Sequence, residues 1–315
     1  MGSLSTAACP VIVFTICGTA LSQPILWRDP GNIAGWDFGG TAGTTVQAPK
    51  PPYTFLREDL SGTQPKILVQ DAAGATWDVK FGYEVKVESF CWRVVHACGY
   101  FVEPSYFVAE GQVVGLQPLR RAGPWVRPDG HFTNGRFQYR DSALKFLERR
   151  SWRWDGPPFA GAKELSGLKV LIMLFSNWDN KDGRVGAGGP NTAVFEQDHR
   201  QIYAFTDWGS GMGLGGDVPG RESNWRCEDY SRQTPDFVRS VDKGRVVVFG
   251  YQGYLERGFD DNIPPAHVAW LMQYLGRITD AQLAAGLKAS GATESESACF
   301  TRELRRRIEQ LRNAR

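Results

Sequence analysis

The chain has 315 residues, of which 42% are hydrophobic and 22% are charged, which is the balance of an ordinary globular protein. This length allows one large domain or two packed lobes. A net charge of +2 argues against nucleic acid as the main partner, because nucleic-acid-binding domains carry a marked excess of positive charge.

The first residues have the pattern of a secretory signal peptide. Residues 11–21 form an apolar stretch, and the small residues Ala20 and Ser22 precede a candidate cleavage point before Gln23. The stretch is too short to span a bilayer as a helix. We therefore predict that residues 1–22 are removed and that the mature chain is periplasmic or secreted, without a transmembrane span. The region before the stretch has no Lys or Arg, so a cytoplasmic protein is the alternative.

Four cysteines lie beyond the predicted signal peptide. Cys91 and Cys98 are seven residues apart on one predicted helix, so their Cα atoms should lie about 10 Å apart. That is beyond the roughly 7 Å limit for a disulfide. Any disulfides should therefore join these two residues to Cys227 and Cys299, in either of two ways. Four buried thiols are the alternative.

Residues 23–52 are rich in Gly, Pro and Thr and are predicted to form an irregular arm. Three predicted strands follow, at residues 53–59, 65–71 and 75–82. In the third strand Trp77, Val79 and Phe81 alternate onto one face, which leaves Lys80 on the other. Taken alone, Lys80 would be a solvent-facing lysine on a half-buried strand.

The next segment is predicted to turn from strand to helix and back. The second half of residues 84–99 has a helical pattern, with Glu88 at the start of that helix. Two further strands are predicted within residues 100–116. A strand pair is predicted within residues 126–140, where Asn134 and the glycine after it mark either a tight turn or a bulge.

The rest of the chain is predicted to be mostly helical. Residues 162–175 are apolar nearly all round, which predicts a central, buried helix. Residues 192–209 predict two short strands joined by a polar turn. Thr279 and Gln282 form a capping-box pattern at the start of another helix. A final amphipathic helix should place its arginines on a solvated face, namely Arg302, Arg305, Arg306, Arg307, Arg312 and Arg315.

Several of these segments carry the residue types that phosphoryl transfer requires. A turn of small and polar residues joins the first two strands and consists of Ser61, Gly62, Thr63 and Gln64. Its backbone N–H groups can bind phosphates. Lys80 supplies a cation for the same phosphates, and Glu88 on the next helix can hold Lys80 by an ion pair.

The polar loop after the buried helix completes this chemistry. Asp179 is the candidate that orients or deprotonates an acceptor hydroxyl, and Lys181 lies close enough in sequence to stabilise the transferring phosphate. Asn191 and Asp207 offer the amide and carboxylate that Mg²⁺ binds. The long spacing before Asn191 leaves Asn180 or Asp182 as alternative ligands. Each aspartate taken singly is more simply a turn residue.

In order and context these motifs resemble the atypical kinases of the HipA type and the phosphatidylinositol-kinase-like type. The resemblance rests on "SGTQPKILV", "WDVKFG" and Glu88, and on the loops "NWDNKD" and "TDWGSGMG", which are similar to those of related uncharacterised bacterial proteins. It implies that Lys80 binds phosphate, that Asp179 is the catalytic aspartate and that Asp207 binds magnesium. No A-P-E sequence follows Asp207, so the substrate platform should differ from that of ordinary protein kinases.

We therefore predict an α+β, two-lobed, protein-kinase-like fold. The N-terminal lobe, residues 53–140, should hold an antiparallel sheet and one helix, and the helical C-terminal lobe should span residues 141–315. The predicted function is ATP- and Mg²⁺-dependent phosphotransfer to an unknown acceptor, such as a protein, a lipid headgroup or a small molecule. The alternatives are a catalytically inactive pseudokinase that binds nucleotide or a partner, and an envelope structural protein with a Trp-rich surface.

Overall fold

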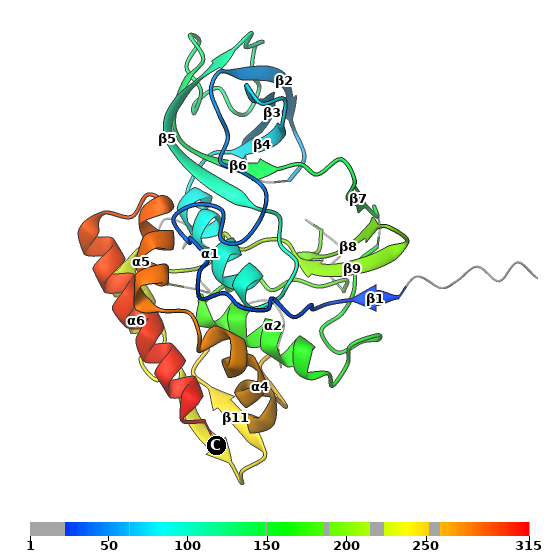
Figure 1. Cartoon of the computed structure of the whole chain (residues 1–315), viewed down its shortest axis with the longest axis vertical. Coiled ribbons are helices and arrows are strands. Elements are labelled where there is room, and N and C mark those ends of the chain that lie inside the picture. Colours follow the sequence, from blue (N-terminus) through cyan, green and yellow to red (C-terminus); the bar gives the residue numbers. More distant parts are fainter. Residues whose placement is uncertain are drawn as a thin grey trace, which may run out of the picture.

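The computed structural model describes residues 23–62, 64–148, 150–184, 189–214, 224–251 and 259–314. The predicted signal peptide, Thr63 and Arg315 lie outside the described residues. The fold mixes helices and strands, as predicted. Figure 1 shows a β-barrel at one end of the molecule and helices α2, α4 and α6 toward the other, with α1 between them.

Five strands close into a barrel in the order β2-β3-β4-β6-β5. Their bounds are β2 Tyr53–Asp59, β3 Lys66–Gln70, β4 Thr76–Lys80, β5 Ser105–Val114 and β6 His131–Tyr139. Neighbouring strands run antiparallel except β2 and β5, which are parallel. The barrel encloses its own apolar cluster, which includes Val79, Trp77 and Phe137. Lys80 therefore lies on the strand face opposite this core, as the alternation predicts.

Two predictions about these strands were wrong. Each of the segments 100–116 and 126–140 contributes one strand rather than two. Pro104 has no N–H to donate to a sheet, and β5 begins immediately after it. Asn134 has a positive φ of 54°, yet β6 continues through it in register with β5 on both sides. The Asn-Gly pair therefore marks an irregularity within one strand and not a hairpin turn.

Helix α1 (Val85–Ala97) begins close after β4 and starts earlier than predicted. Trp92 packs in the barrel cluster, with its ring 5.8 Å from that of Tyr106. Phe90 and Val94, on the other side of the helix, belong to the larger cluster beneath the barrel. Because α1 packs into both clusters, the carboxylates at its N-terminal end are held firmly relative to both.

The larger cluster is built around α2 (Lys163–Leu174), which is buried along its length as predicted. The other elements are β1 Pro24–Ile25, β7 Lys145–Phe146, β8 Thr192–Gln197, β9 Arg200–Phe205, α3 Cys227–Gln233, β10 Val238–Asp242, β11 Val246–Phe249, α4 Pro265–Leu275, α5 Asp280–Ala289 and α6 Glu294–Arg312. The predicted hairpin is β8–β9, and Thr279 and Gln282 form the predicted capping box of α5. Within the described ranges, no helix has the length and apolar character needed to cross a membrane.

One arginine of the last helix, α6, is buried where the prediction placed it in solvent. Arg307 is fully buried and not part of a solvated face. Its guanidinium donates to the carbonyls of Leu174 at 2.8 Å and Tyr230 at 2.6 Å, and it lies 3.7 Å from the centre of the Tyr230 ring. These partners are 133 and 77 residues away in sequence, so the helical pattern of α6 could not reveal them.

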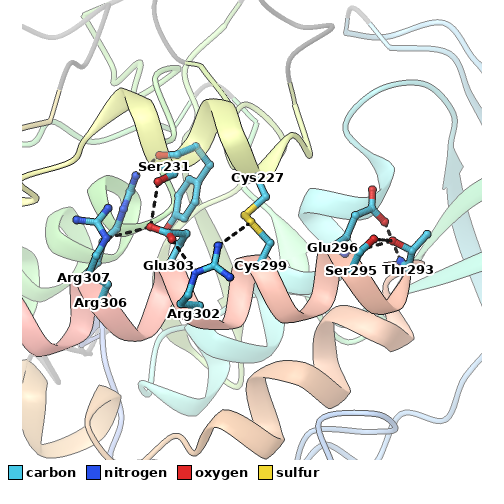
Figure 2. Close-up of a disulfide and its surroundings, with 11 residues drawn as sticks. Cys227, Ser231, Thr293, Ser295, Glu296, Cys299, Arg302, Glu303, Arg306 and Arg307 are labelled. Carbon is cyan, nitrogen blue, oxygen red and sulfur yellow. Dashed lines mark hydrogen bonds and ion pairs between the residues drawn. A yellow bond between two sulfur atoms is a disulfide. The ribbon is translucent and has the colours of Figure 1, made fainter.

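The cysteines also pair differently from the prediction. Cys227 on α3 forms a disulfide with Cys299 on α6, with their Cα atoms 6.2 Å apart (Figure 2). Cys91 on α1 and Cys98 immediately after it are buried free thiols, so they are not bridged to the other two. Cys91 and Cys98 are also not bridged to each other, as their spacing along one helix predicts. The two remaining cysteines instead pair with each other, because α3 packs against α6 at this point.

Candidate functional site

Lys80 lies between two carboxylates of α1. Its Nζ atom is 2.9 Å from Glu84 Oε2 and 2.5 Å from Glu88 Oε1. The ion pair between Lys80 and Glu88 is the predicted one. Gly82, with a φ of +108°, lies in the short connection from β4 to α1 that turns the chain back and brings the two glutamates to the lysine.

Glu84 was missed by the sequence analysis. It occupies the N-cap position of α1 and lies four residues before Glu88, so both side chains reach the same side of the helix end. The helix was predicted to begin later, which left Glu84 in a connecting segment. The i, i+4 spacing of two glutamates after Lys80 is the signal that could have identified it.

The electrostatics of the pair favour a charged lysine. Burial disfavours the ammonium form, but the carboxylates of Glu84, Glu88 and Asp207 outweigh this and raise the pKa of Lys80. The second oxygen of Glu88 lies 2.9 Å from Nε of Arg136 on β6. Glu88 is thus shared between two cations, which fixes its position.

Asp207 follows β9 and joins the same group. Its backbone carbonyl accepts a hydrogen bond from Asn177 Nδ2 at 2.8 Å, and its Oδ1 accepts one from the N–H of Gly209 at 3.1 Å. Carboxylate oxygens of Glu84, Glu88 and Asp207 lie within 4.8 Å of one another. Three carboxylates this close form a suitable donor set for a divalent cation.

The pKa of Asp207 reflects this crowding. Burial, followed by the charges of Glu84, Glu88 and Asp179, raises the pKa of Asp207 to about 7, with Lys80 opposing the shift. A proton on Asp207 relieves the repulsion among the carboxylates. A bound cation would relieve it in the same way and would displace that proton.

Asp179 is close enough to Asp207 for its charge to raise the pKa of that residue. Its side chain is 3% exposed, and its Oδ2 lies 3.0 Å from Nζ of Lys181. The buried Oδ1 accepts no hydrogen bond from any residue in the described ranges. The segments carrying Asp179 and Asp207 are tied together by the bond from Asn177 and by a hydrogen bond of 3.1 Å from the N–H of Trp178 to the carbonyl of Ser210.

Among the other proposed metal ligands, Asp182 has both carboxylate oxygens engaged, whereas Asn191 uses its amide nitrogen and not its amide oxygen. Asn191 directs its Nδ2 to the backbone carbonyl of Asp179 at 2.6 Å, so its amide nitrogen braces the loop. Asp182 is fully buried, and its carboxylate pairs with Arg184 at 2.8 Å and accepts from the N–H of Trp154 at 3.0 Å. Asp182 is therefore a structural residue. The carbonyl of Asn180 accepts from the Trp154 indole at 2.7 Å.

Part of the turn proposed to bind phosphate is already hydrogen-bonded within the protein. Gln64 reaches the site, where its Nε2 donates to Glu84 Oε1 at 3.1 Å. The N–H of Ser61 instead donates to Asp59 at 2.9 Å, and the carbonyl of Gly62 accepts from Arg121 at 3.0 Å. The Ser61 N–H is therefore already engaged, contrary to the prediction that it is available to a phosphate.

A cleft of about 590 Å³ lies between the barrel and the β8–β9 region. This volume is in the range of small-molecule sites. Its wall includes three basic residues, Lys66, Arg140 and Arg150. It also includes Thr206, which directly precedes Asp207 and so marks the end of the cleft nearest the candidate site.

Comparison with known proteins adds little to this geometry. No protein-family model matches the chain, and no curated protein sequence matches it. Among solved structures, the Golgi casein kinase gives a TM-score of 0.35 at 10% identity, covering 84% of this chain and 73% of that one. The same kinase with Mn/ADP bound gives 0.37 at 10% identity, with the same coverage. A likeness with so low a score and identity establishes neither a shared fold nor a shared activity.

Proposed function

We propose that this chain is a kinase-like phosphotransferase that uses ATP and Mg²⁺. The observation that supports this most is the convergence of Lys80, Glu84, Glu88 and Asp207, from three separate segments, with the carboxylate of Asp179 beside them. Phosphoryl transfer depends chiefly on positioning and charge neutralisation, and these residue types supply both. The HipA-type affiliation remains a prediction.

The proposed roles follow from the charges and burial of each group. Lys80 binds the α- and β-phosphates while Glu88 holds it in place. Asp207, with Glu84 or Glu88, holds the metal ion, which neutralises phosphate charge when bound. Asp179 orients the acceptor hydroxyl and receives its proton at Oδ1, the oxygen that no described residue occupies. Lys181 keeps the other oxygen of Asp179 in place.

The proposal also places the nucleotide in the 590 Å³ cleft, as in a two-lobed kinase. The barrel would form the upper wall and the β8–β9 hairpin with its neighbouring loops the lower one. Lys66, Arg140 and Arg150 make the wall basic, which suits a polyanionic ligand. The acceptor remains unassigned, because the residues around Asp179 do not single out one chemical class.

The test is the pH dependence of Mg²⁺ binding in the presence of a non-hydrolysable ATP analogue. Because Asp207 has a pKa of about 7, the cation must displace a proton below that pH. Apparent Mg²⁺ affinity should rise about tenfold per pH unit up to about pH 7 and then level off. Titration calorimetry at several pH values measures this. Asp207→Asn should remove both the affinity and its pH dependence.

The same shift predicts the stability of the metal-free protein. The folded state keeps the Asp207 proton to about pH 7, whereas an aspartate in the unfolded chain releases it near the ordinary value of 3.8. Metal-free protein should therefore lose stability as pH rises between these values, and Mg²⁺ with nucleotide should restore it. A Mg²⁺ affinity that is the same at pH 6 and pH 8, or unchanged in Asp207→Asn, would rule out this metal site.

A catalytically inactive pseudokinase is the second candidate. The observation that favours it is the loop after α2, where Asp182 is locked by Arg184 and the amide nitrogen of Asn191 is bound to a backbone carbonyl. Asp182 is therefore not available as a metal ligand. Nucleotide binding without any transfer, to water or to offered acceptors, would establish this alternative.

We also propose that the protein functions in an oxidising compartment, consistent with a periplasmic or secreted location. The Cys227–Cys299 disulfide supports this, because such bonds persist mainly outside the reducing cytosol.

A further inference from the structure

Behind the candidate site, hydrogen bonds connect α1 to the wall of the cleft. The first step is the ion pair of 2.9 Å between Glu88 Oε2 and Arg136 Nε. Arg136 Nη1 then donates to Gln138 Oε1, and Gln138 Nε2 donates to Glu103 Oε2. Arg136 and Gln138 are alternate residues of β6, so they share one face of that strand. Glu103 lies two residues before Ser105, which pairs with Gln138.

Arg136 fixes which groups donate and which accept along this chain of hydrogen bonds. Arginine offers only N–H donors, so Gln138 must turn its oxygen toward Arg136 and its amide nitrogen toward Glu103. Glu103 therefore receives the hydrogen bond on one oxygen, Oε2. Across the described ranges, its other oxygen, Oε1, accepts no hydrogen bond. Both Gln138 and Glu103 line the cleft.

The position of Glu103 relative to the phosphate groups suggests what it contacts. Lys80 and Asp207 mark the phosphate end of the proposed nucleotide site. Glu103 lies beyond them, linked to Glu88 through Gln138 and Arg136. A nucleotide with its phosphates at Lys80 would extend its base along the cleft toward this wall. A carboxylate oxygen there accepts a hydrogen bond from an amine and repels a carbonyl.

We propose that Glu103 contacts the substituent at the six-position of the purine base and thereby selects 6-aminopurine over 6-oxopurine nucleotides. This rests on the proposed function, since it assumes that a nucleoside triphosphate occupies the cleft. The amine of adenine donates to the free oxygen of Glu103, whereas the carbonyl at the same position of hypoxanthine or guanine would face it oxygen to oxygen. Leaving such polar groups unpaired or opposed is the strongest basis for rejecting a close analogue.

The neighbours of Glu103 act on its pKa in both directions. Burial raises the pKa of Glu103, and Arg140 and Arg136 oppose this shift by favouring the carboxylate. Gln138 also lowers that pKa by donating to the ionised form, whereas Asp78 is among the neighbours that raise it. The net effect is a raised pKa, so binding is measured at about pH 8, where the carboxylate is more populated than at neutral pH.

The experiment compares ATP with ITP, which differ at the six-position and N1, by titrating both with Mg²⁺ into the full chain. The parent should bind ATP at least about tenfold more tightly than ITP. In Glu103→Gln, the amide oxygen still accepts from Gln138, and the amide nitrogen now faces the cleft as a donor. ATP affinity should fall and ITP affinity rise, so that the ratio drops by about tenfold or more.

Two further variants make the result specific. Glu110→Gln makes the same change at an exposed site on β5, and it should leave the ATP-to-ITP ratio unchanged. Glu103→Asp keeps an acceptor but shortens its reach, so it should weaken ATP about tenfold without reversing the preference. This variant decides the matter if Glu103→Gln does not fold, because unchanged ATP affinity in it would overturn the inference.

The failures of the two proposals are distinguishable. Equal affinities of the parent for ATP and ITP, or the same preference in Glu103→Gln as in the parent, would overturn the role of Glu103 and leave the nucleotide site standing. Failure of the parent to bind any nucleoside triphosphate would overturn the proposed function, and the role of Glu103 with it.

Discussion

Replacing Asp179 with asparagine should reduce phosphoryl transfer by about 100- to 10,000-fold while leaving nucleotide affinity within about twofold. An amide is isosteric with the carboxylate but cannot take the acceptor's proton. The Oδ1 atom that would take it is buried and accepts no hydrogen bond from the described residues, so the substitution breaks no hydrogen bond at that atom. Single-turnover transfer and equilibrium nucleotide binding, measured on the same preparations, separate the two effects.

A matched control for this variant is Asp155→Asn. Asp155 also has basic partners nearby, but its side chain is 56% exposed and pairs with Arg153 at 3.0 Å. Exposed pairs of this kind contribute little, so stability, binding and transfer should match the parent. Transfer by Asp179→Asn at the level of this control would remove Asp179 from the catalytic role. A parallel loss of nucleotide binding would show instead that its charge positions the nucleotide.

The sequence allowed the local part of the site to be predicted. Strand alternation around Trp77 and Val79 placed Lys80 on the face away from the barrel core, and Glu88 lies one helical turn into the element that follows. Both inferences need only the periodicity of one strand and one helix. The central burial of α2 was equally local, since its residues are apolar nearly all round.

The parts that failed depend on contacts between distant segments. The irregularity at Asn134 is decided by the pairing of β6 with β5, which a local Asn-Gly signal cannot reveal. Arg307 is buried because carbonyls of α2 and α3 receive its guanidinium, although its neighbours in α6 include exposed arginines. The pairing of Cys227 with Cys299 likewise depends on where whole elements pack.

The disulfide is expected to have the largest effect on stability of any single link in the chain. It joins residues 72 apart in sequence, and constraining an unfolded chain over such a loop contributes about 4 kcal/mol in the chain-entropy model. Beside it, Ser231 of α3 donates to Glu303 of α6 at 3.1 Å (Figure 2). Just before α3, the Trp225 ring packs 5.0 Å from Phe300 of α6 and 6.5 Å from Phe90 of α1.

The double variant Cys227→Ala, Cys299→Ala should therefore lower the free energy of unfolding by up to about 4 kcal/mol, measured by denaturant titration. A reductant should destabilise the parent by a similar amount and leave the double variant unchanged, which controls for effects of the alanines themselves. Because Cys91 and Cys98 are buried thiols outside the bond, alkylation of the unfolded, unreduced parent should label both of them and neither Cys227 nor Cys299. Labelling of all four, or equal stability of oxidised parent and double variant, would show that the bond does not hold α3 against α6.

Loss of the disulfide should also loosen the packing of Trp225 against Phe90 of α1. This would weaken the support of the helix end that carries Glu84 and Glu88. Nucleotide affinity in the still-folded double variant should then fall, and it should do so without any change in the preference for ATP over ITP.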